Sequence, residues 1–250
     1  MNRCCCLLLA CMASMAWGEI VIDRTRLIYP AAQREVTVHL TNRAPEPRLV
    51  QVWMDAGDAQ ARPEFIDVPF SVTPPIVRME PNQRVSLRVF FHPSQALGVA
   101  SDHESVYWLN VLGIAPAQTE GTTGATVQFA FRSRIKVFLR PVGLEGSAGQ
   151  APSTLQWRLI ETSEEGLLVH NPSAFHVSLS RVELQRGEVI RSSEAPPMLG
   201  PSTTMRLSLS AAERRPGRGV EVRFTSLDDY GVPRHHTASP VINPLRGRGY

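Results

Sequence analysis

Residues 125–140 read ATVQFAFRSRIKVFLR and form the longest strand-like run in the chain. Apolar side chains stand at alternate positions through most of this run: Val127, Phe129, Phe131, Ile135, Val137 and Leu139. Such a period of two is typical of a β-strand with one buried face. At about 3.3 Å per residue the run would extend roughly 50 Å, far beyond an ordinary strand. Either the strand bends, or it is long because something else pairs with it.

The rest of the chain shows the same pattern in shorter pieces. Before the long run, three segments alternate apolar and polar residues, at 36–40, 85–89 and 107–111. After it, five more apolar segments follow, at 155–160, 167–169, 177–184, 205–209 and 220–224. The 20 prolines and 17 glycines of the chain fit many turns between short strands. The sequence therefore predicts an all-β protein.

The long run ends at Pro141-Val142-Gly143, and a stretch rich in Gly, Ser, Ala and Pro follows to residue 153. Such composition is typical of a domain boundary. We therefore expect a first domain over 19–141, a linker over 142–153 and a second domain over 154–250. Both halves have the strand spacing of β-sandwiches.

The first 18 residues predict a secretory signal. A short basic start is followed by an apolar run from Cys4 to Ala13, and Ala16-Trp17-Gly18 offers small residues at the positions that a signal peptidase recognises. Cleavage after Gly18 would leave Glu19 as the first residue. One alternative is a buried N-terminal helix, and another is a lipoprotein signal that makes Cys11 the lipid-bearing residue.

Cysteine usage and charge exclude several classes of function. All four cysteines lie within residues 1–18, so the remaining chain has no disulfide, cysteine nucleophile or cysteine metal site. Without residues 1–18 the basic count falls from 26 to 25 against 23 acidic residues, a net charge of +2 that is not typical of nucleic-acid binding. No later segment is apolar enough to cross a membrane, so we expect the mature protein to be soluble.

Signs of an enzyme are weak. The chain has no glycine-rich phosphate loop and no Gly-x-Ser-x-Gly motif, so we expect no catalytic residue and no cofactor. His235 and His236 are adjacent, and on a strand they would face opposite sides rather than share a metal ion. We therefore predict no metal site, and we interpret the basic tail at 246–248 as a solvated chain end.

Several segments, in order, give the chain a family resemblance: DRTRLIYP (23–30), TPPIVRMEP (73–81), ESVYWLNVLGIAP (104–116), RIKVFLRP (134–141), HNPSAFHVSLS (170–180) and DDYG (228–231). Together they resemble the periplasmic pilus chaperones of the PapD-like superfamily, across both domains. The combination of ESVYWLN with RIKVFLRP is the most specific part. One departure is His103, where the family usually has arginine. The resemblance implies two immunoglobulin-like β-sandwich domains at an angle, with a cleft between them.

The resemblance also implies that the long strand is donated to an incomplete pilus subunit. We assign Val127, Phe129 and Phe131 to the face that would fill the groove of the subunit. A donated strand would satisfy the unpaired backbone groups of an open sheet edge, and each fully buried apolar side chain would contribute roughly 1.5–3 kcal/mol. The alternative is that these three residues pack in the protein's own core.

Arg26 and Lys136 match the pair of basic residues that, in the family, grip the C-terminal carboxylate of the subunit. Lys136 is the only lysine among the 26 basic residues of the chain, so its retention makes it a candidate for a specific role. Two cations on one carboxylate would fix the register of strand pairing, and a slip of one residue would turn every side chain to the wrong face. The alternatives are a solvated arginine and an outward strand charge.

Glu104, Arg140 and Asp229 match a charged network that, in the family, lies between the domains and holds their angle. The alternative is three independent surface charges.

The predicted function is capture of pilus or fimbrial subunits in the periplasm, strand donation, and delivery to an outer-membrane usher, without stable insertion into the membrane. A secreted structural or adhesive immunoglobulin-like protein is the alternative, and a β-sandwich hydrolase is a weaker one.

Overall fold

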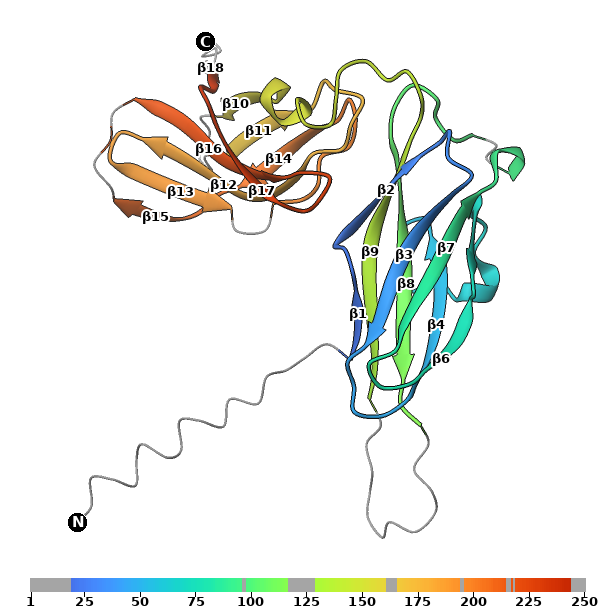
Figure 1. The fold of residues 1–250 in the computed structure, drawn as a ribbon. Coiled ribbons are helices and arrows are strands. Elements are labelled where there is room, and N and C mark those ends of the chain that lie inside the picture. Colours follow the sequence, from blue (N-terminus) through green and yellow to red (C-terminus); the bar gives the residue numbers. More distant parts are fainter. Residues whose placement is uncertain are drawn as a thin grey trace, which may run out of the picture.

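The computed structural model describes residues 19–95, 98–116, 129–160, 166–193, 196–214, 217 and 219–243. Figure 1 shows two β domains, the second lying across one end of the first. Across the described residues the only helices are three short 3-10 turns, η2 (Pro63–Phe65), η3 (Pro93–Gln95) and η4 (Ala151–Thr154), so none is long enough to span a membrane. The predicted all-β, two-domain fold is confirmed.

The first domain is a sandwich of two sheets. One sheet has the order β1 (Ile20–Ile22), β3 (Glu35–Asn42), β7 (Arg84–Phe91) and β5 (Phe70–Thr73). The other has the order β2 (Arg26–Pro30), β9 (Ala130–Arg140), β8 (Ser105–Ile114), β4 (Arg48–Asp55) and β6 (Ile76–Met79). Alternate side chains of both sheets meet in one core, which includes the fully buried Leu40, Leu87, Leu109 and Val137. The alternation at 36–40, 85–89 and 107–111 therefore does mark strands with one buried face.

The second domain repeats this architecture. One sheet has the order β14 (Thr204–Ser208), β11 (Gly166–His170), β10 (Gln156–Ile160) and β18 (Val241–Asn243). The other has the order β15 (Ser210–Arg214), β13 (Val189–Ser193), β12 (Ser178–Arg186), β16 (Val220–Leu227) and β17 (Pro233–Ala238). Its separate core contains Trp157, Leu167, Val182 and Phe224. Each domain thus buries its own apolar surface.

Two expectations change in detail. The stretch 142–153 is not a simple linker, because Ala151 is buried in the second core and Leu144 and Ala148 pack against that core. Of the expected long strand, the structure has β9 from Ala130, preceded by Phe129, whereas residues 125–128 lie outside the described residues. The predicted signal at 1–18 and the tail at 246–248 also lie outside them.

The beginning of the described chain is fixed to the first domain. The carboxylate of Glu19 accepts hydrogen bonds from Nε and Nη2 of Arg48 at 3.0 and 2.9 Å, and the Glu19 carbonyl accepts one from the backbone N–H of Arg43 at 2.7 Å. The Arg48 side chain is buried, so this ion pair has little competition from water. It sets the start of β1.

Candidate functional site

Strand β9 is paired unevenly along its length. Its antiparallel partner β8 runs beside nearly all of it, from Ala130 opposite Ile114 to Leu139 opposite Ser105. On its other side, the parallel strand β2 pairs only with the stretch from Lys136 to Arg140. Within the described part of the chain, the stretch 130–135 therefore has one sheet edge without a neighbouring strand. An open edge offers backbone N–H and C=O groups to an incoming strand.

The same stretch carries two aromatic side chains in solvent. Phe129 and Phe131 are 68% and 59% exposed. They continue the alternation of Ile135, Val137 and Leu139, which are buried in the first core. The structure therefore places these two phenylalanines outside the protein's own core. Val127, the third predicted member of this apolar face, lies outside the described residues.

Arg26 and Lys136, which the resemblance paired, occupy matching positions on neighbouring strands. Residue 26 of β2 and residue 136 of β9 are direct register partners in the parallel ladder. Arg26 Nη1 donates to the Ser178 hydroxyl at 3.4 Å and to the Leu227 carbonyl at 3.2 Å, so it also contacts the second domain. Two cationic side chains thus lie together where β2 begins to cover β9.

These two cations are incompletely satisfied. Nε of Arg26 is buried without a hydrogen-bond partner. Among the described residues, the ammonium of Lys136 has no hydrogen-bond or ion-pair partner. Burial and the neighbouring Arg26 charge hold the pKa of Lys136 below its usual value. Burial also lowers the pKa of Arg26, against the opposing effect of Asp229 and Asp228. Adding an anion would relieve both groups.

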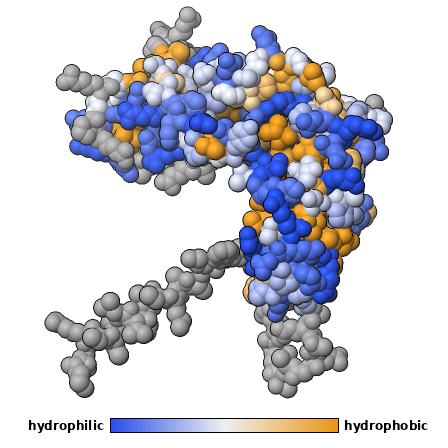
Figure 2. Space-filling model, viewed as in Figure 1, coloured by the Kyte–Doolittle hydropathy of each residue, from blue (hydrophilic) through white to orange (hydrophobic). Residues whose placement is uncertain are grey.

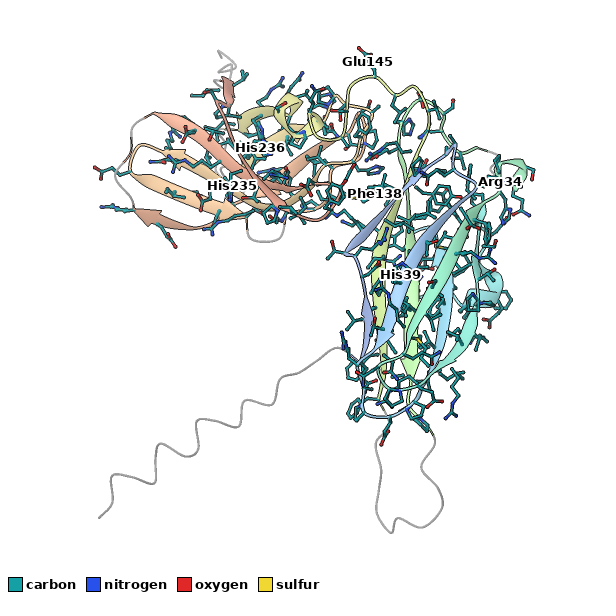
Figure 3. The ribbon with its side chains drawn as sticks, viewed as in Figure 1. Arg34, His39, Phe138, Glu145, His235 and His236 are labelled. Atoms are coloured by element: carbon teal, nitrogen blue, oxygen red, sulfur yellow. The ribbon has the colours of Figure 1, made fainter. Side chains whose placement is uncertain are left out.

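A cleft of about 490 Å³ lies between the domains next to this pair. It is lined in part by Arg26, Phe138, Arg140, His176, Asp229 and Tyr230. Lys136 lies beside Arg26 but is not among the lining residues. In Figure 2 the cleft region is the concave corner between the two domains, where apolar and hydrophilic surface are mixed. Figure 3 shows Phe138 at this junction, with His235 and His236 on the second domain.

The structure brings Glu104, Arg140 and Asp229 together across the domain interface. Nε of Arg140 donates to Glu104 at 2.6 Å, and its two terminal nitrogens donate to both oxygens of Asp229 at 2.8 and 2.9 Å. The Glu104 side chain is 2% exposed and also accepts the backbone N–H of His176 at 2.9 Å. Although burial acts to lower the pKa of Arg140, the two carboxylates raise it well above its usual value.

Backbone contacts support this network. The N–H of Glu104 donates to the carbonyl of Ala174 in the second domain at 2.9 Å. Asp229 lies in the turn between β16 and β17, and in this turn Gly231 has a φ of +79°. A side chain at residue 231 would place its Cβ 2.3 Å from the hydroxyl of Thr25, so the close approach of the two domains requires glycine there.

Two interface residues, Phe138 and His176, were not predicted from the sequence. Phe138 is 3% exposed although it stands on the face of β9 opposite the core, and its ring centre lies 5.6 Å from that of His176. The signal in the sequence that could have indicated the burial of Phe138 was an apolar residue among the charged positions of that face.

The histidines predicted to face opposite sides contact different partners: His235 bonds Thr225 at 3.1 Å, and His236 bonds Ser226 at 2.8 Å. In the described part of the chain no group of three or more metal-ligating side chains occurs.

Comparison with known proteins gives matches over both domains. Residues 19–145 match the family model described as pili and flagellar-assembly chaperone, PapD N-terminal domain, and residues 150–238 match the model described as pili assembly chaperone PapD, C-terminal domain. The chain is 37% identical over 227 residues to chaperone protein FimB/FhaD of Bordetella pertussis, which covers 90% of this chain and 89% of that protein.

Solved structures agree. The crystal structure of the YadV chaperone is 31% identical, with a TM-score of 0.74 over 88% of this chain and 99% of that one. The crystal structure of the Pseudomonas aeruginosa CupB2 chaperone is 32% identical, with a TM-score of 0.72 over 88% of this chain and 100% of that one.

Proposed function

This chain belongs to the family of PapD-type pili assembly chaperones, and on that premise we propose that it captures pilus subunits by donating strand β9. One observation carries the proposal: within the described part of the chain β9 has an open edge over 130–135, and at the same place it exposes Phe129 and Phe131. A subunit that lacks one strand would pair its backbone with this edge and bury the two rings in its groove.

The pair Arg26 and Lys136 is the proposed anchor for the C-terminal carboxylate of the subunit. A carboxylate placed here would accept hydrogen bonds from the half-buried guanidinium of Arg26 and from an ammonium that lacks a partner among the described residues. Charge-assisted bonds of this kind are worth roughly 1.5–3 kcal/mol each. Because the two cations are register partners in the β2–β9 ladder, a chain end held by both would have its pairing with the open edge of β9 fixed.

The Glu104–Arg140–Asp229 network is proposed to hold the angle between the domains. It joins the end of β9 to the turn between β16 and β17, and both lie beside the cleft. A fixed angle keeps the second-domain groups Ser178 and Leu227 against Arg26, and so keeps the anchor in place. The role of the network is therefore structural.

The relatives are named chaperones, and the proposed capture of subunits is binding rather than catalysis. We place the protein in the periplasm, on the predicted signal at 1–18 and a remaining chain without cysteine. The captured subunit would then pass to an outer-membrane usher, where the strand of the next subunit replaces β9. The matched relatives are named chaperones, which favours subunit capture over the alternative of a secreted structural or adhesive protein.

Co-purification of a subunit with anchor variants tests the proposal. A pilus subunit from the same organism is expressed with wild type, Lys136→Ala or Arg26→Ala, each shown to be folded by circular dichroism. Arg24→Ala is the matched control, because Arg24 lies in the same segment but, among the described residues, pairs only with the neighbouring Asp23. We expect capture by wild type and by the control and a marked loss in both anchor variants. Undiminished capture by both anchor variants would exclude the anchor.

A further inference from the structure

The outer face of β9 carries two arginines whose guanidinium groups lie over tryptophan rings of β8 and β4. The guanidinium carbon of Arg132 is 4.8 Å from the ring centre of Trp53 on β4, and that of Arg134 is 4.5 Å from the ring centre of Trp108 on β8. Both arginines belong to the half-paired stretch 130–135. They stand on the face opposite Phe131, because successive side chains of a strand alternate.

A buried carboxylate binds Arg134 on this face. Asp55, at the end of β4, is 1% exposed and accepts Nε of Arg134 at 3.0 Å, the amide of Asn110 at 2.7 Å and the backbone N–H of Gly57 at 2.7 Å. A terminal nitrogen of Arg134 donates to the other carboxylate oxygen, so the ion pair is bidentate. Burial acts to raise the pKa of Asp55, but these donors outweigh it and the pKa is lowered.

Arg132 extends the network. Its Nε and Nη2 donate to the side-chain oxygen of Asn110 at 3.0 and 2.7 Å, and its Nη1 donates to the carbonyl of Ala59 at 2.6 Å. Asn110 in turn donates to Asp55. A continuous set of bonds therefore joins the loop after β4, the strands β4 and β8, and the open stretch of β9.

Both arginines lean in the same direction along the sheet. Arg134 stands opposite Asn110 in the ladder but binds Asp55, which pairs with Trp108, the residue opposite Lys136. Arg132 stands opposite Leu112 but binds Asn110, which is two residues further toward the same end. Each side chain therefore reaches one diagonal step toward the part of β9 that β2 covers.

We propose that Arg132 and Arg134, held by Asn110 and Asp55, are positioning residues that lock the register of the donor stretch in the free chaperone. This inference rests on the proposed function of β9. A strand with one neighbour is held by half the usual backbone bonds, and a slip of one residue would turn Phe131 outward and drive the arginines toward the core. The two bonded arginines oppose such a slip, so the open edge stays in the register that the anchor requires.

The test combines amide hydrogen exchange of the free chaperone with its affinity for a purified subunit. The variants are Arg132→Met and Arg134→Met, which keep an apolar stem over the tryptophan, and Arg134→Lys, which keeps the charge but loses the bidentate fork. Arg88→Met is the matched control, because Arg88 also pairs with a carboxylate, that of Glu35 at 3.7 Å, and stacks on Phe90, but stands on β7 of the other sheet. If Arg134→Met fails to fold, Arg132→Met still tests the proposal.

We expect exchange over 130–135 to accelerate about tenfold or more in the two Met variants, with subunit affinity falling by a similar factor. Arg134→Lys should lie between wild type and Arg134→Met, and exchange in β3 and β7 should stay unchanged. Unchanged exchange over 130–135, acceleration spread over the whole domain, or local acceleration without loss of affinity would each overturn the inference. Failure of strand donation itself is seen separately, as undiminished capture by a Phe129 variant.

Discussion

Truncation of Phe129 to alanine separates a donated strand from a structural one. The side chain is 68% exposed in the free protein. Since a phenylalanine can bury on the order of 200 Å², about 140 Å² of this ring remains available to a partner. At roughly 25 cal/mol per Å², full burial is worth about 3 kcal/mol. Allowing for the Cβ that alanine keeps, we expect Phe129→Ala to weaken subunit binding by roughly 2–3 kcal/mol, or about 30- to 150-fold.

The stability of the free chaperone should change little. An exposed side chain contributes little to folding, so the free energy of unfolding should stay within about 0.5 kcal/mol of wild type. The assay measures subunit affinity by titration and unfolding by urea for the same preparations. Phe65→Ala is the control, because Phe65 is 77% exposed but lies in η2, away from β9. Equal affinity of Phe129→Ala and wild type, or a large loss of stability, would refute the assignment of this ring to the donor face.

Three further predictions follow from the other parts of the site. Arg140→Met should lower the free energy of unfolding by about 2–3 kcal/mol in a urea titration, because Glu104 stays buried without its cation while Asp229 turns to solvent; unchanged stability would contradict the network. Subunit affinity should fall as the pH rises through the lowered pKa of Lys136, and a pH titration of Lys136→Arg should show no such fall. N-terminal sequencing of the periplasmic fraction should begin at Glu19, and a lipid on Cys11 would contradict the predicted signal.

The sign of the Lys136 effect differs between binding and stability. The lowered pKa means that, over the window between the folded and unfolded values, the unfolded chain binds more protons. The contribution of this group to stability therefore rises with pH over that window, whereas the charge needed by a carboxylate is lost. Opposite slopes for stability and subunit affinity are a signature that a surface lysine would not give.

Local patterns allowed prediction of four of the nine first-domain strands that the structure describes, β3, β7, β8 and β9, but not of their partners. Period two is a property of neighbouring residues, so the strands around Val38, Leu87 and Leu109 were found from sequence. Pairing is not local: β1 and β2 are separated by three residues yet lie in different sheets. Short or polar strands such as β13, β17 and β18 carry little alternation and were missed, because their stability comes from neighbours rather than from their own residues.

The candidate site divides in the same way. The alternation in the sequence indicated that Phe129 and Phe131 share one face of the strand. Their exposure could not be predicted in the same way, because it depends on how far the opposing sheet covers that face. Arg26 and Lys136 were paired only through the family resemblance, since no spacing rule relates residues 110 positions apart. The bond from Arg134 to Asp55 spans 79 residues and had no motif to mark it. The burial of Phe138 needs the second domain as well as the first.

The most direct test of carboxylate anchoring is a thermodynamic cycle with a peptide. The peptide carries the C-terminal strand of the subunit, with either a free carboxylate or an amide at its end, and its affinity is measured for wild type and Lys136→Ala. We predict that amidation weakens binding to wild type by about 10- to 150-fold, the value of one charge-assisted bond, and weakens binding to Lys136→Ala much less. An equal loss on amidation in both proteins would contradict the account, because the carboxylate would then be bound elsewhere.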